Sequence, residues 1–121
     1  MFTDSNLESI NFGKNFNTSK VTTMNGMFDG CTKIQTLDLS TFDTSSVTDM
    51  SAMFWGMTNL STIYATNDFN RTSVTNSNNM FQNDNKLKGG LGTTLSSTGN
   101  ITNSTYAQID NSTHNGYFTQ K

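Results

Sequence analysis

The sequence predicts an α/β solenoid in which each repeat of about 26 residues contributes one short parallel strand and one short helix. The dipeptide Met-Phe recurs at spacings of 26, 26 and 27 residues. Within each repeat the apolar period changes from two to between three and four, and the repeat stops at about Leu87. A fixed period of this length is typical of proteins whose units bury apolar residues only against their neighbours. The four pairs are Met1-Phe2, Met27-Phe28, Met53-Phe54 and Met80-Phe81.

The first half of each repeat is predicted to be a strand. Leu37 and Leu39 alternate with polar residues, and this period of two is typical of a half-buried strand. The strands of successive repeats are expected to stack in parallel, about 4.8 Å apart, with the helices on the other side of the core. The corresponding positions in the neighbouring repeats are Ile10 and Phe12, then Ile63 and Ala65.

The second half of each repeat is predicted to be a short helix. Ser46 followed by Asp49 resembles a capping box that starts the helix at about Val47, and Gly56 suits its end. The apolar residues of the second repeat recur at steps of three and four, which places them on one helical face. They are Val47, Met50, Met53, Phe54 and Met57. Across the repeats, the predicted structural core is Val21, Val47 and Val74 together with Met27, Phe28, Met53, Phe54, Met80 and Phe81.

The chain is predicted to form a single structural domain. Three repeats span about 7–33, 34–60 and 61–87, preceded by the tail of another, and 88–121 form a C-terminal cap that covers the last apolar edge. The helical face of the third repeat is thinner, because Asp84 replaces Met57. Within the cap, 96–105 is predicted to be a loop. The predicted buried cap residues are Leu91, Tyr106, Ile109, Tyr117 and Phe118.

The N-terminus falls inside a repeat, and it has no capping sequence of its own. We interpret the chain as the end of a longer array; alternatively, Met1 serves as both initiator and core residue. An apolar edge around Ile10, Phe12 and Met24 would then be exposed and could pair with a second copy.

Two stretches of the chain match a known family. The run Leu-Asp-Leu-Ser-Thr-Phe-Asp-Thr-Ser-Ser-Val-Thr-Asp-Met-Ser-Ala-Met-Phe from Leu37, and Tyr-Ala-Gln-Ile-Asp with the later Gly-Tyr-Phe-Thr, resemble the bacterial surface protein 26-residue repeat and its end segment. These are the BspA-like leucine-rich-repeat surface proteins. The resemblance implies a leucine-rich-repeat-like solenoid outside the cell, with adhesion as its role and no catalytic residues. One departure is an extra residue between Phe12 and Phe16.

Composition argues against several classes of function. The formal charge is −2 and the basic residues are scattered, so neither nucleic acid nor an anionic membrane is an expected partner. No apolar run is long enough to cross a bilayer. The lone Cys31 occupies the position of Met57, which favours a buried apolar role, and the only histidine, His114, lies in a polar stretch far from it. We therefore predict no enzyme activity, cofactor or metal site.

Binding residues are expected where the repeat leaves a position free to vary. The outward strand row contains Asn11, Asp38 and Tyr64, and extended faces of this kind are where solenoids bind. Trp55 is the other candidate, because its counterparts Asp29 and Gln82 are polar. Exposed tryptophan is a frequent anchor for a partner, although Trp55 could equally cover the helix row of a neighbouring repeat.

These observations predict a non-enzymatic extracellular or cell-surface module. Its role would be adhesion to a protein or glycan of a host or neighbouring cell, or that of a spacer. The alternative is a structural protein that self-assembles through the N-terminal edge. A third hypothesis is ice binding, since Thr22, Thr48 and Thr75 would form a row.

Overall fold

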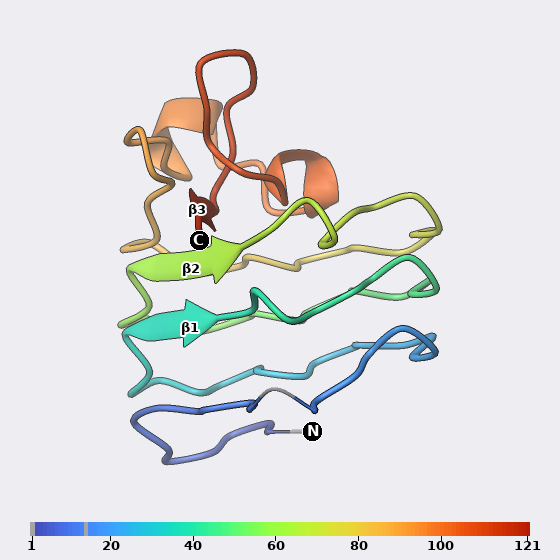
Figure 1. Ribbon diagram of the computed structural model, residues 1–121. Helices are drawn as coiled ribbons and strands as arrows, with labels where there is room; N and C mark the ends of the chain where they lie inside the picture. Colours follow the sequence, from blue (N-terminus) through green and yellow to red (C-terminus); the bar gives the residue numbers. More distant parts are fainter. Residues whose placement is uncertain (1, 14) are drawn as a thin grey trace.

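The computed structural model describes residues 2–13 and 15–121 as a stack of irregular coils, closed at the C-terminal end by a cap (Figure 1). Met1, the first predicted anchor, lies outside the described residues. The strands are β1 (Thr36–Asp38), β2 (Thr62–Ala65) and β3 (Thr119–Gln120). Two short 3₁₀ turns, η1 (Ser96–Thr98) and η2 (Ser104–Tyr106), lie in the cap.

The three strands form one parallel sheet in the order β1-β2-β3. Leu37 pairs with Ile63, and both side chains are fully buried beneath the sheet. β1 and β2 come from successive repeats, whereas β3 is the end of the cap, which returns to the sheet and pairs with the far edge of β2. The cap therefore continues the sheet as well as covering the core.

The helices predicted from the sequence, and with them the α/β solenoid of leucine-rich-repeat type, are wrong. No α-helix occurs in the part of the chain that the structure describes. The segment from Val47 to Met57, and its counterparts in the other repeats, form consecutive turns. The apolar residues still face the core, because successive turns return a side chain to the same side at steps of three and four much as a helix does.

Backbone hydrogen bonds explain why these segments form turns. Alternate N–H groups donate to a carbonyl of the next coil, as Phe28 N does to Met53 O at 2.8 Å. In the following coil Phe54 N donates to Met80 O at 2.9 Å. The intervening N–H groups donate three residues back, as Met53 N does to Met50 O at 3.2 Å. A helix would direct all its N–H groups along its own axis and leave none for the neighbouring coil.

Each turn segment also contains two residues in the left-handed region of φ, which interrupt a helix. Gly26, for example, is the third residue of the turn closed by Met27 N and Met24 O, where a type II turn requires positive φ. The first such positions in successive coils are Gly26, Ala52 and Asn79, with φ of 62°, 55° and 59°; the second are Gly30, Gly56 and Asn83, with φ of 75°, 74° and 70°.

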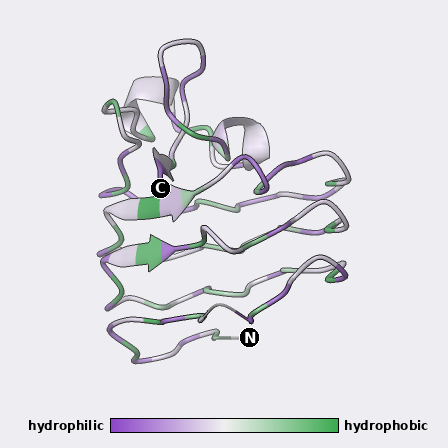
Figure 2. Ribbon diagram, in the orientation of Figure 1, coloured by the Kyte–Doolittle hydropathy of each residue, from purple (hydrophilic) through white to green (hydrophobic). Residues whose placement is uncertain are grey.

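The core lies between the sheet and the turn segments, and a column of stacked phenylalanines passes through it. Neighbouring rings of the column lie 5.7, 5.7 and 5.3 Å apart, with interplanar angles of 9°, 6° and 13°. Each such pair contributes about 0.5–1.5 kcal/mol beyond the burial of its area. The hydropathy colouring places apolar residues at the centres of β1 and β2 (Figure 2). The column consists of Phe2, Phe28, Phe54 and Phe81.

The predicted repeat core divides into two groups. The later three Met-Phe pairs and Val47 are buried, whereas Val21 and Val74 are only partly buried. Both partly buried valines pack against the core cluster from its margin. The Met-Phe positions thus fill the interior, and the valine row borders it.

The cap ends the phenylalanine column with an aromatic ring in a different orientation. Tyr117 meets Phe81 edge-on, with ring centroids 5.0 Å apart and an interplanar angle of 76°. Its hydroxyl donates to Ile101 O at 2.7 Å and lies 2.6 Å from Thr98 Oγ1. A perpendicular ring offers no flat face to a further coil, so the stack stops here.

A buried carboxylate, that of Asp110, organises the chain around this end of the sheet. It accepts hydrogen bonds from Leu91 N (2.8 Å), from Thr93 N and Oγ1 (3.1 and 2.8 Å) and from Gly116 N (3.3 Å). Burial alone would raise the pKa of Asp110, but these hydrogen bonds outweigh it and lower the pKa. A Cβ at Gly89 would lie 2.7 Å from the same carboxylate, so only glycine fits there.

Two predictions for the cap are wrong. Leu91 is 68% exposed, because its backbone N–H binds Asp110 while its side chain points outward; Leu95 is buried instead. The stretch 96–105, predicted as a loop, contains both η1 and the start of η2. Ile109, Tyr117 and Phe118 are buried and Tyr106 packs partly against the core.

Candidate binding surface

The sheet brings two of the three predicted row residues together. Asp38 of β1 is the register partner of Tyr64 of β2, and Tyr64 in turn pairs with Thr119 of β3. Asn11 does not pair in the sheet, which begins at β1 in the part of the chain that is described, but together with Asp38 it lines a hollow of about 230 Å³. Its side-chain oxygen accepts the N–H of Gly13 at 3.0 Å, and so closes a local turn.

The C-terminal residue, Lys121, links Asp38 and Tyr64. Its ammonium lies 2.9 Å from Asp38 Oδ2 and 5.2 Å from the centroid of the Tyr64 ring. Burial would raise the pKa of Asp38, but hydrogen bonds from Ser40 and Lys121 outweigh it and lower the pKa. Both charged side chains are about half exposed, so the pair stabilises the fold by at most about 1 kcal/mol. Its main effect is to hold the ring of Tyr64 from one side.

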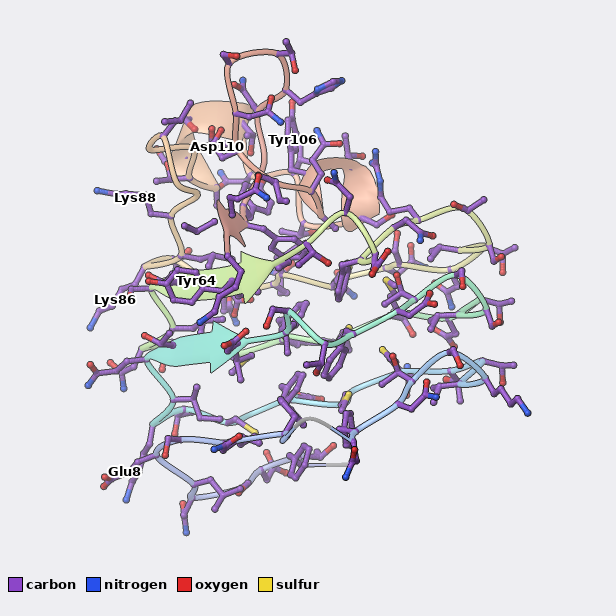
Figure 3. The ribbon with its side chains drawn as sticks, in the orientation of Figure 1. Glu8, Tyr64, Lys86, Lys88, Tyr106 and Asp110 are labelled. Atoms are coloured by element: carbon purple, nitrogen blue, oxygen red, sulfur yellow. The ribbon has the colours of Figure 1, made fainter. Side chains whose placement is uncertain are left out.

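A groove lies beside Tyr64 where the cap joins the sheet. It has a volume of about 410 Å³ and is lined by Ser61, Thr62, Tyr64, Lys86, Lys88, Gly89, Gly90 and Thr119. Figure 3 shows Lys86 and Lys88 extending from the side of the stack where β2 begins, with the ring of Tyr64 over that strand. The Lys86 ammonium donates to Asn59 Oδ1 of the preceding coil at 3.1 Å.

The groove arises because two separate segments cover the outer edge of β2. Lys88 N donates to Ser61 O at 3.0 Å beside the start of the strand, and Thr119 pairs with Tyr64 near its end. Gly90 N joins the two segments by donating to Phe118 O at 3.4 Å. Between them the outward row passes over Gly90, which has no side chain and whose missing Cβ would face Thr119, and the surface is therefore hollow at this point.

Trp55 lies apart from this groove, on the turn segment across the core from the sheet. Its side chain is 38% exposed, one of the few large apolar groups at the surface. Its backbone belongs to the inter-coil hydrogen bonds, since Gly30 N donates to Trp55 O at 2.8 Å. The two strongest sequence candidates, Trp55 and Tyr64, therefore belong to different faces and do not form one site.

The groups considered for chemistry lie apart and have structural partners. Cys31 is buried, and its Sγ–H donates to Phe2 O at 2.9 Å; burial raises the pKa of the thiol. His114 is exposed in the cap, with Nδ1 2.9 Å from Thr113 Oγ1. Among the described residues, no three His, Cys, Asp or Glu side chains gather closely enough to hold a metal ion.

Two of the three hydroxyls in the threonine row that suggested ice binding are engaged in hydrogen bonds. Thr48 Oγ1 donates to Thr22 O at 3.1 Å, and Thr75 Oγ1 donates to Thr48 O at 3.3 Å. Both hydroxyls therefore contribute to the contact between coils, and the row is one residue wide.

The sequence did not predict that the residues at the junction with the cap would form a groove. Lys86, Lys88 and Gly90 fall at the point where the repeat ends, and Thr119 lies 29 residues beyond Gly90. A signal was present in Lys86 and Lys88, which flank the buried Leu87 and correspond to Asn59 and Ser61 of the preceding repeat. The return of the chain end to β2 has no counterpart in the repeat pattern.

The fold defines the class of protein: a repeat solenoid whose coils are joined by backbone hydrogen bonds and whose last coil is closed by a cap. The chain belongs to the family described as "Mycoplasma protein of unknown function, DUF285", whose model matches residues 1–116. The match includes the repeats and most of the cap. No curated protein and no solved structure matches the chain. No helix in the described part of the chain is long and apolar enough to pass through a bilayer.

Proposed function

We propose that this chain is a non-enzymatic binding module of a bacterial surface protein, and that it contributes to adhesion through the outward face of its sheet. The observation that carries the proposal is that recurring and variable positions of the repeat lie in different places. Side chains that recur in every repeat, such as Phe28, Phe54 and Phe81, are buried in the core. Side chains that differ between repeats, such as Asp38 and Tyr64, stand on the outer face.

The form of the surface supports binding of an extended or multivalent partner. The groove beside Tyr64 is open, and most of its lining residues carry a hydroxyl or ammonium group, which suits an exposed protein segment or glycan better than a small molecule enclosed on all sides. Three short strands offer a patch smaller than the roughly 800 Å² per partner of a stable protein interface, so each contact is weak. Repetition along an array, or many copies on a surface, would supply the avidity that adhesion needs.

An extracellular location belongs to the same proposal. It rests on the resemblance of the repeats to BspA-like surface proteins. An adhesin does not need catalytic residues, and the buried Cys31 and the distant His114 do not form a reactive pair.

Immobilised protein and glycan arrays test the proposal. We expect the wild-type chain, displayed in several copies on a bead, to bind at least one class of immobilised material. Tyr64→Ala should reduce that binding at least tenfold, whereas Thr58→Ala, an exposed position on the turn segments, should leave it unchanged. Trp55→Ala reports whether the opposite face takes part. Absence of binding by the multivalent wild type would contradict the proposal.

A further inference from the structure

The groove beside Tyr64 has an uneven distribution of charge. Lys86 and Lys88 both line it, and none of its lining residues is acidic. Two carboxylates lie nearby but outside the lining: that of Asp38 is paired with Lys121, and that of Asp110, behind Gly89, is occupied by four hydrogen bonds within the cap. In a chain of net charge −2, two lysines in one groove without a facing carboxylate form a local site for an anion.

The two ammonium groups differ in how firmly they are held. Lys86 is fixed by its hydrogen bond to Asn59, whose own side-chain N–H donates to Thr32 O at 2.6 Å. The backbone N–H of Lys88 donates to Ser61 O just before β2, while its exposed side chain extends outward at the border of the groove. One charge is therefore positioned in advance, and the other is free to close on a ligand.

The remaining walls supply the other contacts that a sugar uses. Tyr64 offers an aromatic ring, held on one side by the Lys121 ammonium. Thr62 and Thr119 offer hydroxyls that can donate or accept hydrogen bonds. The groove volume of about 410 Å³ lies within the usual range for small-ligand sites and can hold one sugar ring or two.

We propose that the groove lined by Tyr64, Lys86, Lys88 and Thr119 binds a sugar that bears a carboxylate. The carboxylate lies between the two ammonium groups, the ring of the sugar lies against Tyr64, and its hydroxyls reach Thr62 and Thr119. This inference rests on the proposed binding function and names its ligand class. Sialic acids and uronic acids both fit this ligand class, because both combine a pyranose ring with a carboxylate.

Nuclear magnetic resonance titration of the intact chain tests this assignment. The probes are sialyllactose, a glucuronic-acid disaccharide and neutral lactose. We expect one or both acidic sugars to shift the amide signals of Tyr64, Gly90 and Thr119, and lactose at the same concentration to leave them in place. The affinity should fall as salt is raised, because the contact is between partly exposed charges. Whichever acidic sugar produces the shifts identifies the source of the carboxylate.

Matched variants separate charge from shape. Lys88→Glu should weaken binding at least tenfold, and the same change at Lys20, an exposed residue outside the groove, should have no effect. Gly90→Leu should fill the hollow and block the sugar. A Cβ at Gly90 would lie 3.5 Å from Thr119 Cγ2, an ordinary contact, so the fold should tolerate this change. The dispersion of the amide spectrum verifies that each variant is folded.

The outcomes distinguish this inference from the function on which it rests. Equal binding of acidic and neutral sugars, or full binding by Lys88→Glu, would overturn the carboxylate assignment. If no sugar binds but a protein on the array does, in a manner that depends on Tyr64, the adhesive function stands and the glycan inference is wrong. If neither sugars nor any arrayed material binds, both are wrong.

Discussion

At the scale of single residues, Asp84 shows how one substitution in a repeat changes the physics of its position. It occupies the core position filled by Cys31 and Met57 in the preceding coils and is fully buried. One carboxyl oxygen accepts the N–H of Met57 at 2.9 Å, and the other has no hydrogen-bond partner in the described residues. Burial raises the pKa of Asp84 to about 9, against a smaller lowering by the Met57 N–H. The carboxyl group is therefore protonated at neutral pH.

This environment makes stability depend on pH in a defined direction. The folded state binds the proton up to about pH 9, whereas the unfolded chain releases it above 3.8, so the folded state loses stability as pH rises between these values. The slope is about 1.4 kcal/mol for each pH unit. Asp84→Asn keeps an acceptor for Met57 N–H and has no proton to lose, so it should be more stable than wild type at pH 7, by up to about 4 kcal/mol.

Chemical unfolding at pH 4 and pH 7 measures this effect. The two proteins should differ much less at pH 4, which lies close to the unfolded pKa of 3.8, so that little of the pH-dependent loss of stability has developed. Asp68→Asn, at an exposed position, controls for the loss of one negative charge. A gain for Asp84→Asn that is the same at both pH values would contradict the assignment.

At the scale of elements, the turn segments are the feature that sequence reasoning missed. A run of apolar residues at steps of three and four is compatible with a helix and with consecutive turns, and the pattern alone does not separate them. Glycines four residues apart, at Gly26 and Gly30, were a signal against a helix, because glycine destabilises a helix interior. In the structure both have positive φ. The abundance of Ser, Thr, Asn and Asp was another, since these residues favour turns over helix interiors.

Ala52→Gly distinguishes the two structures by the sign of its effect. In a helix interior, this change would destabilise the protein by about 1 kcal/mol. Ala52 instead has a φ of 55°, which costs a residue with a Cβ about 1–2 kcal/mol, and its counterpart in the preceding coil is Gly26. We therefore expect Ala52→Gly to raise the free energy of unfolding by about 0.5–1 kcal/mol after the entropy of glycine is included.

A matched glycine substitution gives the reference for this measurement. Asn78 is exposed and does not have positive φ, so Asn78→Gly should lower the unfolding free energy slightly. Thermal unfolding of both variants beside wild type provides the comparison. Destabilisation by Ala52→Gly of the same size as that by Asn78→Gly would contradict the turn geometry.

At the scale of the whole molecule, the aromatic column and the inter-coil hydrogen bonds couple each coil to the next. A repeat stack derives its stability from the coils and their nearest-neighbour contacts, so removal of an interior contact affects two interfaces and removal of a terminal one affects a single interface. Phe54 has stacked partners on both sides, Phe28 and Phe81, whereas Phe2 is stacked on Phe28 alone.

Alanine substitutions along the column should therefore differ in cost. We expect Phe54→Ala to destabilise the protein by about 3–5 kcal/mol, because it leaves a cavity in a fully buried site. Phe2→Ala, at a half-buried position, should cost about half as much or less. Urea unfolding followed by circular dichroism measures both. Equal losses would show that the column is not a chain of neighbour contacts.

The proposed function also belongs to this scale, since the groove exists only when the cap has returned to the sheet. Tyr64 and Lys88 come from the repeats and their end, and Thr119 comes from the last residues of the chain. A change that detaches the cap should therefore abolish binding without altering Tyr64 itself. Arg71 is a suitable position, because its guanidinium donates to Ser104 O, Thr105 O and Gln108 Oε1 of the cap.

The sequence by itself determined the period, the inward positions and the existence of a cap. The Met-Phe positions from Met27 onward are buried because each repeat has few apolar residues and must direct them to one side. The tertiary structure decided what a single repeat cannot specify. Turns replace helices because N–H groups are shared between one coil and the next, and the groove beside Tyr64 forms because β3 pairs with β2 from far along the chain. Both depend on contacts between distant residues, which a local pattern does not contain.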